Sequence, residues 1–144
     1  MELTFEIITL SVLIALSGFF SGLEVALVGV TRSKVNQMLS KKLPGAKSLH
    51  KLKSNPSRMM ASVNLGNNLV NFSSTALATD IALKIFENNG LAIVIGAMTF
   101  LILVFGEITP KTYCNANAAK IALRYSRVLL AFSYAFYPVV WIFE

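Results

Sequence analysis

Four asparagines lie close together in a stretch that is otherwise apolar enough for a membrane. They occur in "NLGNNLVNFSST" (64–75), three or four residues apart, at positions Asn64, Asn67, Asn68 and Asn71. In a helix these spacings place side chains on one face, and Ser74 and Thr75 extend that face by a turn. Hydrogen bonds between membrane helices contribute only about 0.6–2 kcal/mol each, so four amides exceed what packing requires. The pattern favours oxygen ligands facing a water-filled or ion-filled cavity; the alternative is polar contact within a dimer.

A second polar group lies in "FGEITPKTY" (105–113), directly after an apolar run. Pro110 cannot donate a backbone hydrogen bond, and its ring clashes with the carbonyl of residue 106. Gly106 also lets another group come close. Broken helices at membrane depth occur where they line a cavity, and their freed carbonyls are common cation ligands. With the negative charge of Glu107 at the same level, this stretch predicts a cation site.

Small and acidic residues also interrupt the first apolar run, within "SGFFSGLE" (17–24). For Ser17 and Gly18, close helix packing is the favoured role, since small residues allow backbones to approach. The Ser21 hydroxyl is a candidate ligand. A carboxylate at depth is costly, so Glu24 needs a partner or lies near the cytoplasmic interface. We expect Glu24 and Lys111 to pair as a gate at the cytoplasmic mouth; the alternative, that Lys111 reaches lipid phosphates, is equally open.

The ligand set predicted by these residues consists of oxygen atoms alone: hydroxyls, amides, main-chain carbonyls and one carboxylate. Such donors suit hard cations such as Mg²⁺, Ca²⁺ or Na⁺. The single cysteine, Cys114, fits no multi-cysteine metal spacing, and the single histidine, His50, lies among lysines. With one core carboxylate and no serine–histidine arrangement, an enzyme is not expected.

The elements that hold these residues are predicted to be membrane helices. Of the 144 residues, 55% are hydrophobic and only 14% are charged, against roughly 25% charged in soluble proteins. A span needs about 20 mostly apolar residues, and three stretches qualify, at about 5–30, 59–86 and 91–113. We therefore expect one all-α integral membrane domain over 1–144, with three transmembrane helices and amphipathic juxtamembrane helices. So few spans do not readily enclose a pathway, which favours a homodimer.

Charge predicts the orientation. The net charge is +6, and the basic segment 32–58 contains no acidic residue. By the positive-inside rule this segment is cytoplasmic and the N-terminus lies outside, on the side of Glu87. Contact with anionic lipids explains the basic residues better than nucleic acid does, and residues 33–42 and 46–53 have the pattern of surface helices. The region 115–143 is either a surface helix followed by a short fourth span, 128–143, or a helix along the interface.

Several motifs together resemble the transmembrane domain of the CNNM/CorB/CorC magnesium transporters. They are "FFSGLEVAL" (19–27), "NPSRMMASVNLGNNLVNFSSTALAT" (55–79), "FLILVFGEITPKTY" (100–113) and the terminal "YPVVWIF" (137–143). The resemblance implies Mg²⁺ efflux, in some descriptions coupled to Na⁺ entry. It implies a multi-pass homodimer in the plasma membrane, with a belt-like helix after the third span and a cytoplasmic C-terminus.

The resemblance also implies the ion-site residues, which are Ser21, Asn67, Asn71, Gly106 and Glu107, with Ser73 or Ser74 as a further ligand. Family members continue into a cytoplasmic pair of CBS domains, and this pair is absent from a sequence that stops at Glu144; a truncated chain and a minimal member are both open. The alternative function is a non-transporting Mg²⁺ sensor or scaffold that regulates another channel. The residues alone do not separate Mg²⁺ from Ca²⁺ or Mn²⁺.

Overall fold

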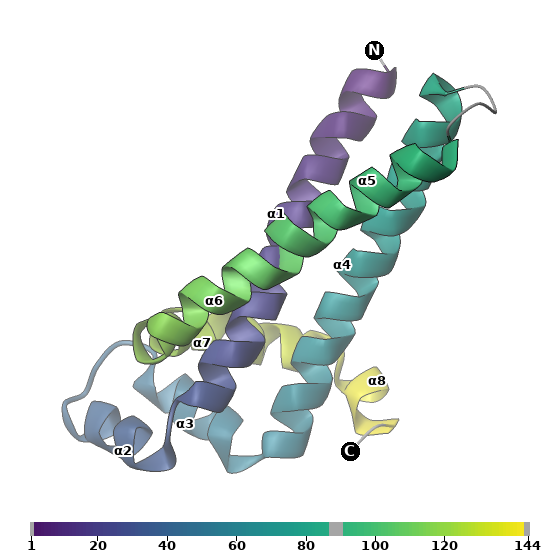
Figure 1. Ribbon diagram of the computed structural model, residues 1–144. Helices are drawn as coiled ribbons and strands as arrows, with labels where there is room; N and C mark the ends of the chain where they lie inside the picture. Colours follow the sequence, from purple (N-terminus) through teal and green to yellow (C-terminus); the bar gives the residue numbers. More distant parts are fainter. Residues whose placement is uncertain (1, 87–90, 143–144) are drawn as a thin grey trace.

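Three long helical segments rise from a layer of short helices (Figure 1). The computed structural model describes residues 2–86 and 91–142, and all regular structure there is helical. The long segments are α1 (Glu2–Gly29), α4 (Pro56–Ile85), and a third that runs through α5 (Leu91–Leu103), the π-helical turn η1 (Val104–Ile108) and α6 (Thr109–Ala116). The all-α prediction is confirmed for the described residues.

Two of the long segments have the length and apolar composition of membrane spans. They cover Leu3–Gly29 and Leu91–Ala116, in agreement with the spans predicted at 5–30 and 91–113. With 30 residues α4 is long enough as well, but its asparagines and serines lower its mean hydropathy. Within the described residues α4 does not qualify on composition, so the second predicted span, at 59–86, stays a prediction.

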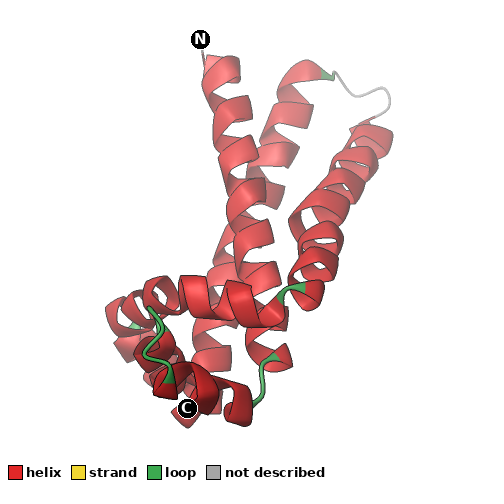
Figure 2. Ribbon diagram, turned by 90° about the vertical axis from the view of Figure 1, so that its left-hand side faces the viewer, coloured by secondary structure: helices red, strands yellow, loops and turns green. Residues whose placement is uncertain are grey.

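The short helices form a layer at one end of the long ones, here called the basic layer. It consists of α2 (Arg32–Ser40), α3 (Ala46–Ser54), α7 (Ala118–Ala135) and α8 (Tyr137–Ile142). Figure 2 shows α7 running across the base of the long helices. The surface helices predicted at 33–42 and 46–53 are confirmed as helices. Within the region 115–143, residues 118–135 and 137–142 form two helices that separate at Phe136, and as far as they are described neither qualifies as a span.

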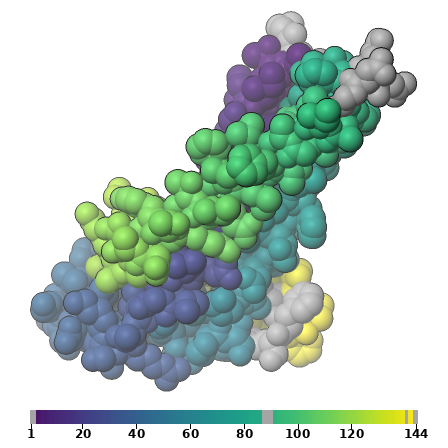
Figure 3. Space-filling view, in the orientation of Figure 1, coloured from purple at the N-terminus to yellow at the C-terminus, as the bar shows by residue number. Residues whose placement is uncertain are grey.

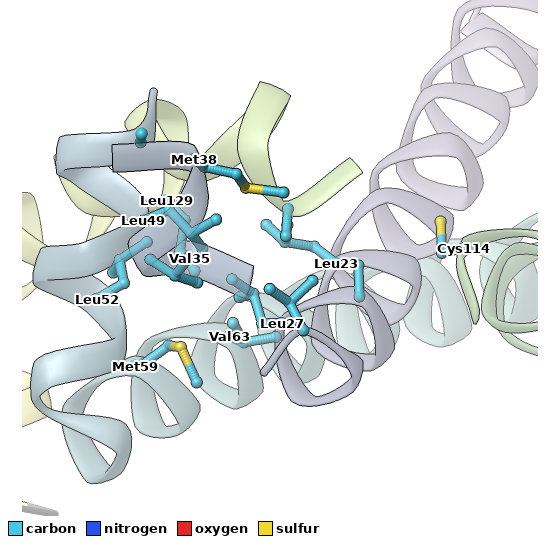
Figure 4. Close-up of a cluster of buried hydrophobic side chains, with 14 of the residues drawn as sticks. Leu23, Leu27, Val35, Met38, Leu49, Leu52, Met59, Val63, Cys114 and Leu129 are labelled. Atoms are coloured by element: carbon cyan, nitrogen blue, oxygen red, sulfur yellow. The ribbon is translucent and has the colours of Figure 1, made fainter. Parts of the chain in front are cut away.

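Buried apolar side chains pack the basic layer against the end of α1. Leu27 of α1 packs with Val35 of α2, Leu49 of α3 and Leu129 of α7, each at most 2% exposed (Figure 4). Farther up, large apolar side chains such as Phe72 and Ile93 are 74% and 78% exposed. A buried core at the base and an apolar surface above it are what a domain partly immersed in lipid requires.

Local contacts set the ends of the helices in the basic layer. The Asn55 side chain accepts a hydrogen bond from the backbone N–H of Arg58 at 3.1 Å, so it caps α4 before Pro56; an asparagine followed by proline is a sequence signal for a helix start. Lys53 Nζ donates to the carbonyl of Leu27 at 2.8 Å and so stabilises the last turn of α1. Burial, and secondarily the nearby Arg32 guanidinium, lower the pKa of Lys53.

The two ends of the molecule differ in charge. The N-terminal end of α1 lies beside the C-terminal end of α4, and the basic layer lies at the opposite end (Figures 1 and 3). Lys84 of α4 pairs there with Glu6 of α1 and with Asp80 at 2.7 Å. The predicted outer-side charge Glu87 lies outside the described residues. The basic side chains of 32–58 lie at the far end, which matches the charge separation used to predict orientation.

Candidate cation site

Two serines of α1 face two asparagines of α4. Ser17 and Ser21 are one turn apart, as are Asn67 and Asn71, and the helices run antiparallel. Ser21 Oγ donates to Asn67 Oδ1 at 3.0 Å, and Ser17 Oγ lies 2.5 Å from Asn71 Oδ1. Asn71 Nδ2 is 3.4 Å from Asn67 Oδ1. The four side chains therefore form one polar cluster between two membrane-length helices.

The third long segment adds a backbone oxygen. The carbonyl of Gly106 lies 3.1 Å from Ser17 Oγ. In an α-helix this carbonyl would accept from residue 110, but Pro110 has no N–H to donate. The Gly106 carbonyl therefore contacts α1, while its role as a cation ligand stays a prediction. The predicted break is wrong in form, because the chain stays helical and widens into the π turn η1 over Val104–Ile108.

The two serines of the cluster are buried, and the Ser17 hydroxyl has more acceptors around it than hydrogens to donate. Ser17 and Ser21 are 1% and 0% exposed. The Ser17 hydroxyl has one hydrogen, while both Asn71 Oδ1 and Gly106 O lie within hydrogen-bonding distance of it. Partial negative charge from three oxygens thus converges at one point, and such an arrangement favours a cation.

Close helix contacts allow this convergence. A Cβ atom on Gly106 would lie 3.1 Å from Ser17 Oγ, and one on Gly18 would lie 2.9 Å from Pro110 Cγ. The predicted packing role of Gly18 is therefore confirmed. For Ser17 the packing interpretation is incomplete, since its hydroxyl contacts both α4 and η1.

A charged group lies next to the cluster, toward the basic layer. Lys111 Nζ is 3.0 Å from Glu107 Oε1 and 3.5 Å from Glu24 Oε2. The expected contact between Glu24 and Lys111 is present, while its role as a gate stays a prediction. In the described contacts the Glu107 carboxylate bonds to Lys111 and not to the serine–asparagine cluster.

Two serines that were predicted as alternative ion ligands lie apart from the cluster. Ser74 is fully buried, but its hydroxyl donates to the carbonyl of Val70 within α4 at 2.8 Å. The exposed Ser73 bonds to Leu69 in the same way. The structure thus brings neither hydroxyl into hydrogen-bond contact with the cluster.

The four asparagines do not form a single stripe. Asn64 and Asn68 line a hollow of 420 Å³ on the exposed face of α4, together with Ser57, Ala61 and Leu65. Successive helical residues are about 100° apart, so positions 64 and 68 fall to one side of positions 67 and 71. Only the latter pair faces α1.

The structure adds Ser17 to the candidate site. Its signal in the sequence was the spacing of four residues between Ser17 and Ser21, which equals the spacing between Asn67 and Asn71. On two antiparallel helices, equal spacings allow both pairs to meet at once.

These motifs and their arrangement match a known domain. The model of the cyclin M (CNNM) transmembrane N-terminal domain matches residues 7–144. The chain belongs to the CNNM family. The family assignment inferred from the sequence motifs is thereby confirmed, and the chain is a membrane domain.

Curated relatives of this CNNM domain occur in bacteria and plants. A UPF0053 protein of Haemophilus influenzae is 36% identical over 94% of this chain and 32% of its own length. A UPF0053 inner membrane protein of Escherichia coli is 34% identical over 88% of this chain and 30% of its own length. A chloroplastic DUF21 domain-containing protein of Arabidopsis thaliana is 35% identical over 90% of this chain and 20% of its own length. The chain spans about a third, or less, of these relatives.

Proposed function

We propose that this CNNM domain carries Mg²⁺ across the membrane through the site between α1, α4 and η1. The observation that supports this most is the convergence of the two serine–asparagine pairs with the Gly106 carbonyl. Ligands about 2.0–2.1 Å from an octahedral Mg²⁺ lie about 2.9 Å from one another. The oxygen separations at Ser17 and Ser21, 2.5, 3.1 and 3.0 Å, are close to that value.

The proposed ligands are Ser21, Asn67, Asn71, Ser74, the Gly106 carbonyl and Glu107, and we add Ser17. A single carboxylate gives binding weak enough for release, while neutral oxygens replace part of the hydration shell. Glu107 now binds the Lys111 ammonium. An arriving cation would take the place of that ammonium on Glu107. The displaced Lys111 ammonium could then pair with the Glu24 carboxylate, which is 3.5 Å away. Efflux, with Na⁺ as the coupling ion, is the direction that the family resemblance favours.

The proposed topology has three spans, and α4 is the one added to the two that composition identifies. The polar cluster on α4 faces α1, whereas Leu69 and Phe72 on α4 are 48% and 74% exposed, so apolar side chains are available to face lipid or a second copy of the chain. We propose a multi-pass homodimer in the plasma membrane, with the N-terminus outside and the basic layer and C-terminus in the cytoplasm. The greater length of the relatives leaves room for a cytoplasmic CBS pair.

Purified protein in sealed liposomes tests this function. Liposomes loaded with Mg²⁺ should release it only when they contain the chain, because a transporter moves the ion unaided. A dye that responds to Mg²⁺ outside the vesicles records the release. A sensor or scaffold would bind Mg²⁺ without releasing it, so binding without flux would support the alternative.

Exchange of the charges at the proposed gate is a second prediction. Glu24→Lys and Lys111→Glu should each reduce Mg²⁺ release strongly, because each places two like charges side by side. The double variant should recover part of the rate by restoring the pair. Recovery should be partial, because Lys111 also holds Glu107, which would then lie beside a new carboxylate. Release rates of the four proteins give the result, and no recovery would contradict the pairing.

A methyl group at Gly106 is a third prediction. Gly106→Ala places a Cβ 3.1 Å from Ser17 Oγ, so the hydroxyl must shift by a few tenths of an ångström. We expect Mg²⁺ affinity to fall about tenfold, because ligand geometry around Mg²⁺ has little tolerance. Flux measured against Mg²⁺ concentration should show the change in the half-saturating concentration. The control is Gly96→Ala in α5, where a Cβ meets no atom of the described residues within 4 Å.

A further inference from the structure

A small hollow in the basic layer is lined by basic and hydroxyl groups. It has a volume of 120 Å³ and lies between α3, the start of α4, and α7. Its polar lining residues are Lys51, Ser54, Asn55, Arg58, Ser133 and Tyr134. The charged residues in this lining are Lys51 and Arg58, and both are positive.

The guanidinium of Arg58 has an unused donor in this region. Its Nε donates to Ser133 Oγ at 3.2 Å, whereas Nη2 is buried and has no hydrogen-bond partner among the described residues. Tyr137 and Tyr134 hold the group in place, with their ring centroids 4.5 and 5.1 Å from Arg58 Cζ. A buried charged donor without an acceptor is costly and rare, so the geometry indicates a missing acceptor.

Lys51 brings a second positive charge to the same place. Its Nζ lies 5.1 Å from the centroid of the Tyr134 ring that Arg58 also contacts. Neither Lys51 nor Arg58 forms an ion pair within 2–86 and 91–142, and residues 32–58 include no acidic side chain. Two uncompensated cations at one hollow favour an anion as the missing acceptor.

We propose that this hollow binds a phosphate group. The planar fork of Arg58 suits two phosphate oxygens, and Lys51 acts as a point charge on a third. The Ser133 hydroxyl of α7 accepts from Arg58 Nε and so keeps its own hydrogen for a phosphate oxygen, whereas the Ser54 hydroxyl donates to the carbonyl of Lys51 at 2.6 Å. Because the donors come from three helices, they surround a tetrahedral anion better than a flat carboxylate. The phosphate has two sources, the headgroup of an anionic phospholipid or a free phosphate in the cytoplasm. This site does not depend on the proposed Mg²⁺ transport.

Binding to the purified chain in uncharged detergent tests the proposal. The two probes are inorganic phosphate and monomeric dihexanoyl phosphatidic acid, each titrated by calorimetry against potassium acetate at equal ionic strength as the blank. Lys51→Gln should weaken binding about fivefold, and Arg58→Gln by tenfold or more. Lys34→Gln is the matched control, because Lys34 is an exposed lysine on α2 outside this hollow.

Each outcome decides the proposal. Saturable binding of both probes, weakened by Lys51→Gln, supports a site for the phosphate group itself. Binding of phosphatidic acid alone supports the lipid headgroup as the source. Saturation by neither probe overturns the proposal, as does equal binding by wild type and Lys51→Gln. Lys51 is exposed, so its variant should fold normally and keeps the test valid if Arg58→Gln does not fold.

Discussion

Replacing Asn71 by alanine is expected to abolish Mg²⁺ release from loaded liposomes, with a loss of about 100-fold or more. The side chain connects the site, because its Oδ1 lies 2.5 Å from Ser17 Oγ and its Nδ2 lies 3.4 Å from Asn67 Oδ1. Removing it takes away one proposed ligand and releases two others from their positions. The fold should survive, since α1 and α4 remain packed through apolar neighbours such as Phe20, which contacts Gly66.

The control for this prediction is Asn64→Ala. It removes the same side chain from the same helix, but Asn64 lies on the exposed hollow of α4, away from α1. Release should stay close to the wild-type rate, and gel filtration in detergent should show the same size for all three proteins. If Asn71→Ala releases Mg²⁺ normally, or Asn64→Ala loses release equally, the site does not lie between α1 and α4.

Gly22→Ala is expected to give the largest loss of stability among the glycine substitutions in α1. A Cβ at this position would lie 2.5 Å from Cys114 Sγ and 3.4 Å from the carbonyl of Pro110. Overpacking of this kind costs about 1–3 kcal/mol, because α6 must move away from α1. Since η1 precedes α6 directly, the Gly106 carbonyl should move with it and Mg²⁺ affinity should fall too. Thermal unfolding in detergent, followed by circular dichroism, measures the effect.

Two further variants separate this clash from the general effect of losing a glycine. Gly96→Ala changes a glycine with open space around it, so it should leave the unfolding temperature unchanged or raise it slightly. Cys114→Ala removes the sulfur atom that the new methyl group would meet, so it should restore much of the stability of Gly22→Ala. A double variant no more stable than Gly22→Ala would mean that the two helices do not meet at this point.

Much of the fold followed from short-range patterns in the sequence. Apolar runs gave the first and third long helices, and Asn55-Pro56 gave the start of α4, because a side-chain cap depends on residues three apart. In the region left open, 115–143, the end of α7 has a local cause and its placement does not. α7 ends next to Phe136, two residues before Pro138, which lacks the N–H that the carbonyl of residue 134 would need in a continuing helix. That α7 lies against α1, α3 and α4 depends on packing, which periodicity alone does not reveal.

The candidate site was predictable only in part. Periodicity identified the polar face of α4 but not which edge of it α1 would cover, so Asn64 and Asn68 were grouped with the asparagines that face α1. Ser17 was assigned to packing because its partners are 54 and 89 residues away in the chain. The contact between Lys111 and Glu107 follows from a helical spacing of four, a favourable order for a Glu–Lys pair. That Glu24 also contacts the Lys111 ammonium depends on how α1 packs against α6, and the sequence does not reveal this packing.

The π turn η1 changes which side chains of the third long segment face α1. A π turn holds an extra residue, so everything after it is rotated by about 100° relative to an uninterrupted α-helix. None of the described side chains of α5 is buried, whereas Gly106 of η1 and Cys114 of α6 are buried. Before the extra residue the segment contributes only partly buried side chains, Met98 and Ile102, to its packing against α1 and α4, and after it the segment places buried residues against α1. Deleting one residue from 104–108 would keep the chain helical and yet turn Pro110 and Cys114 away from α1.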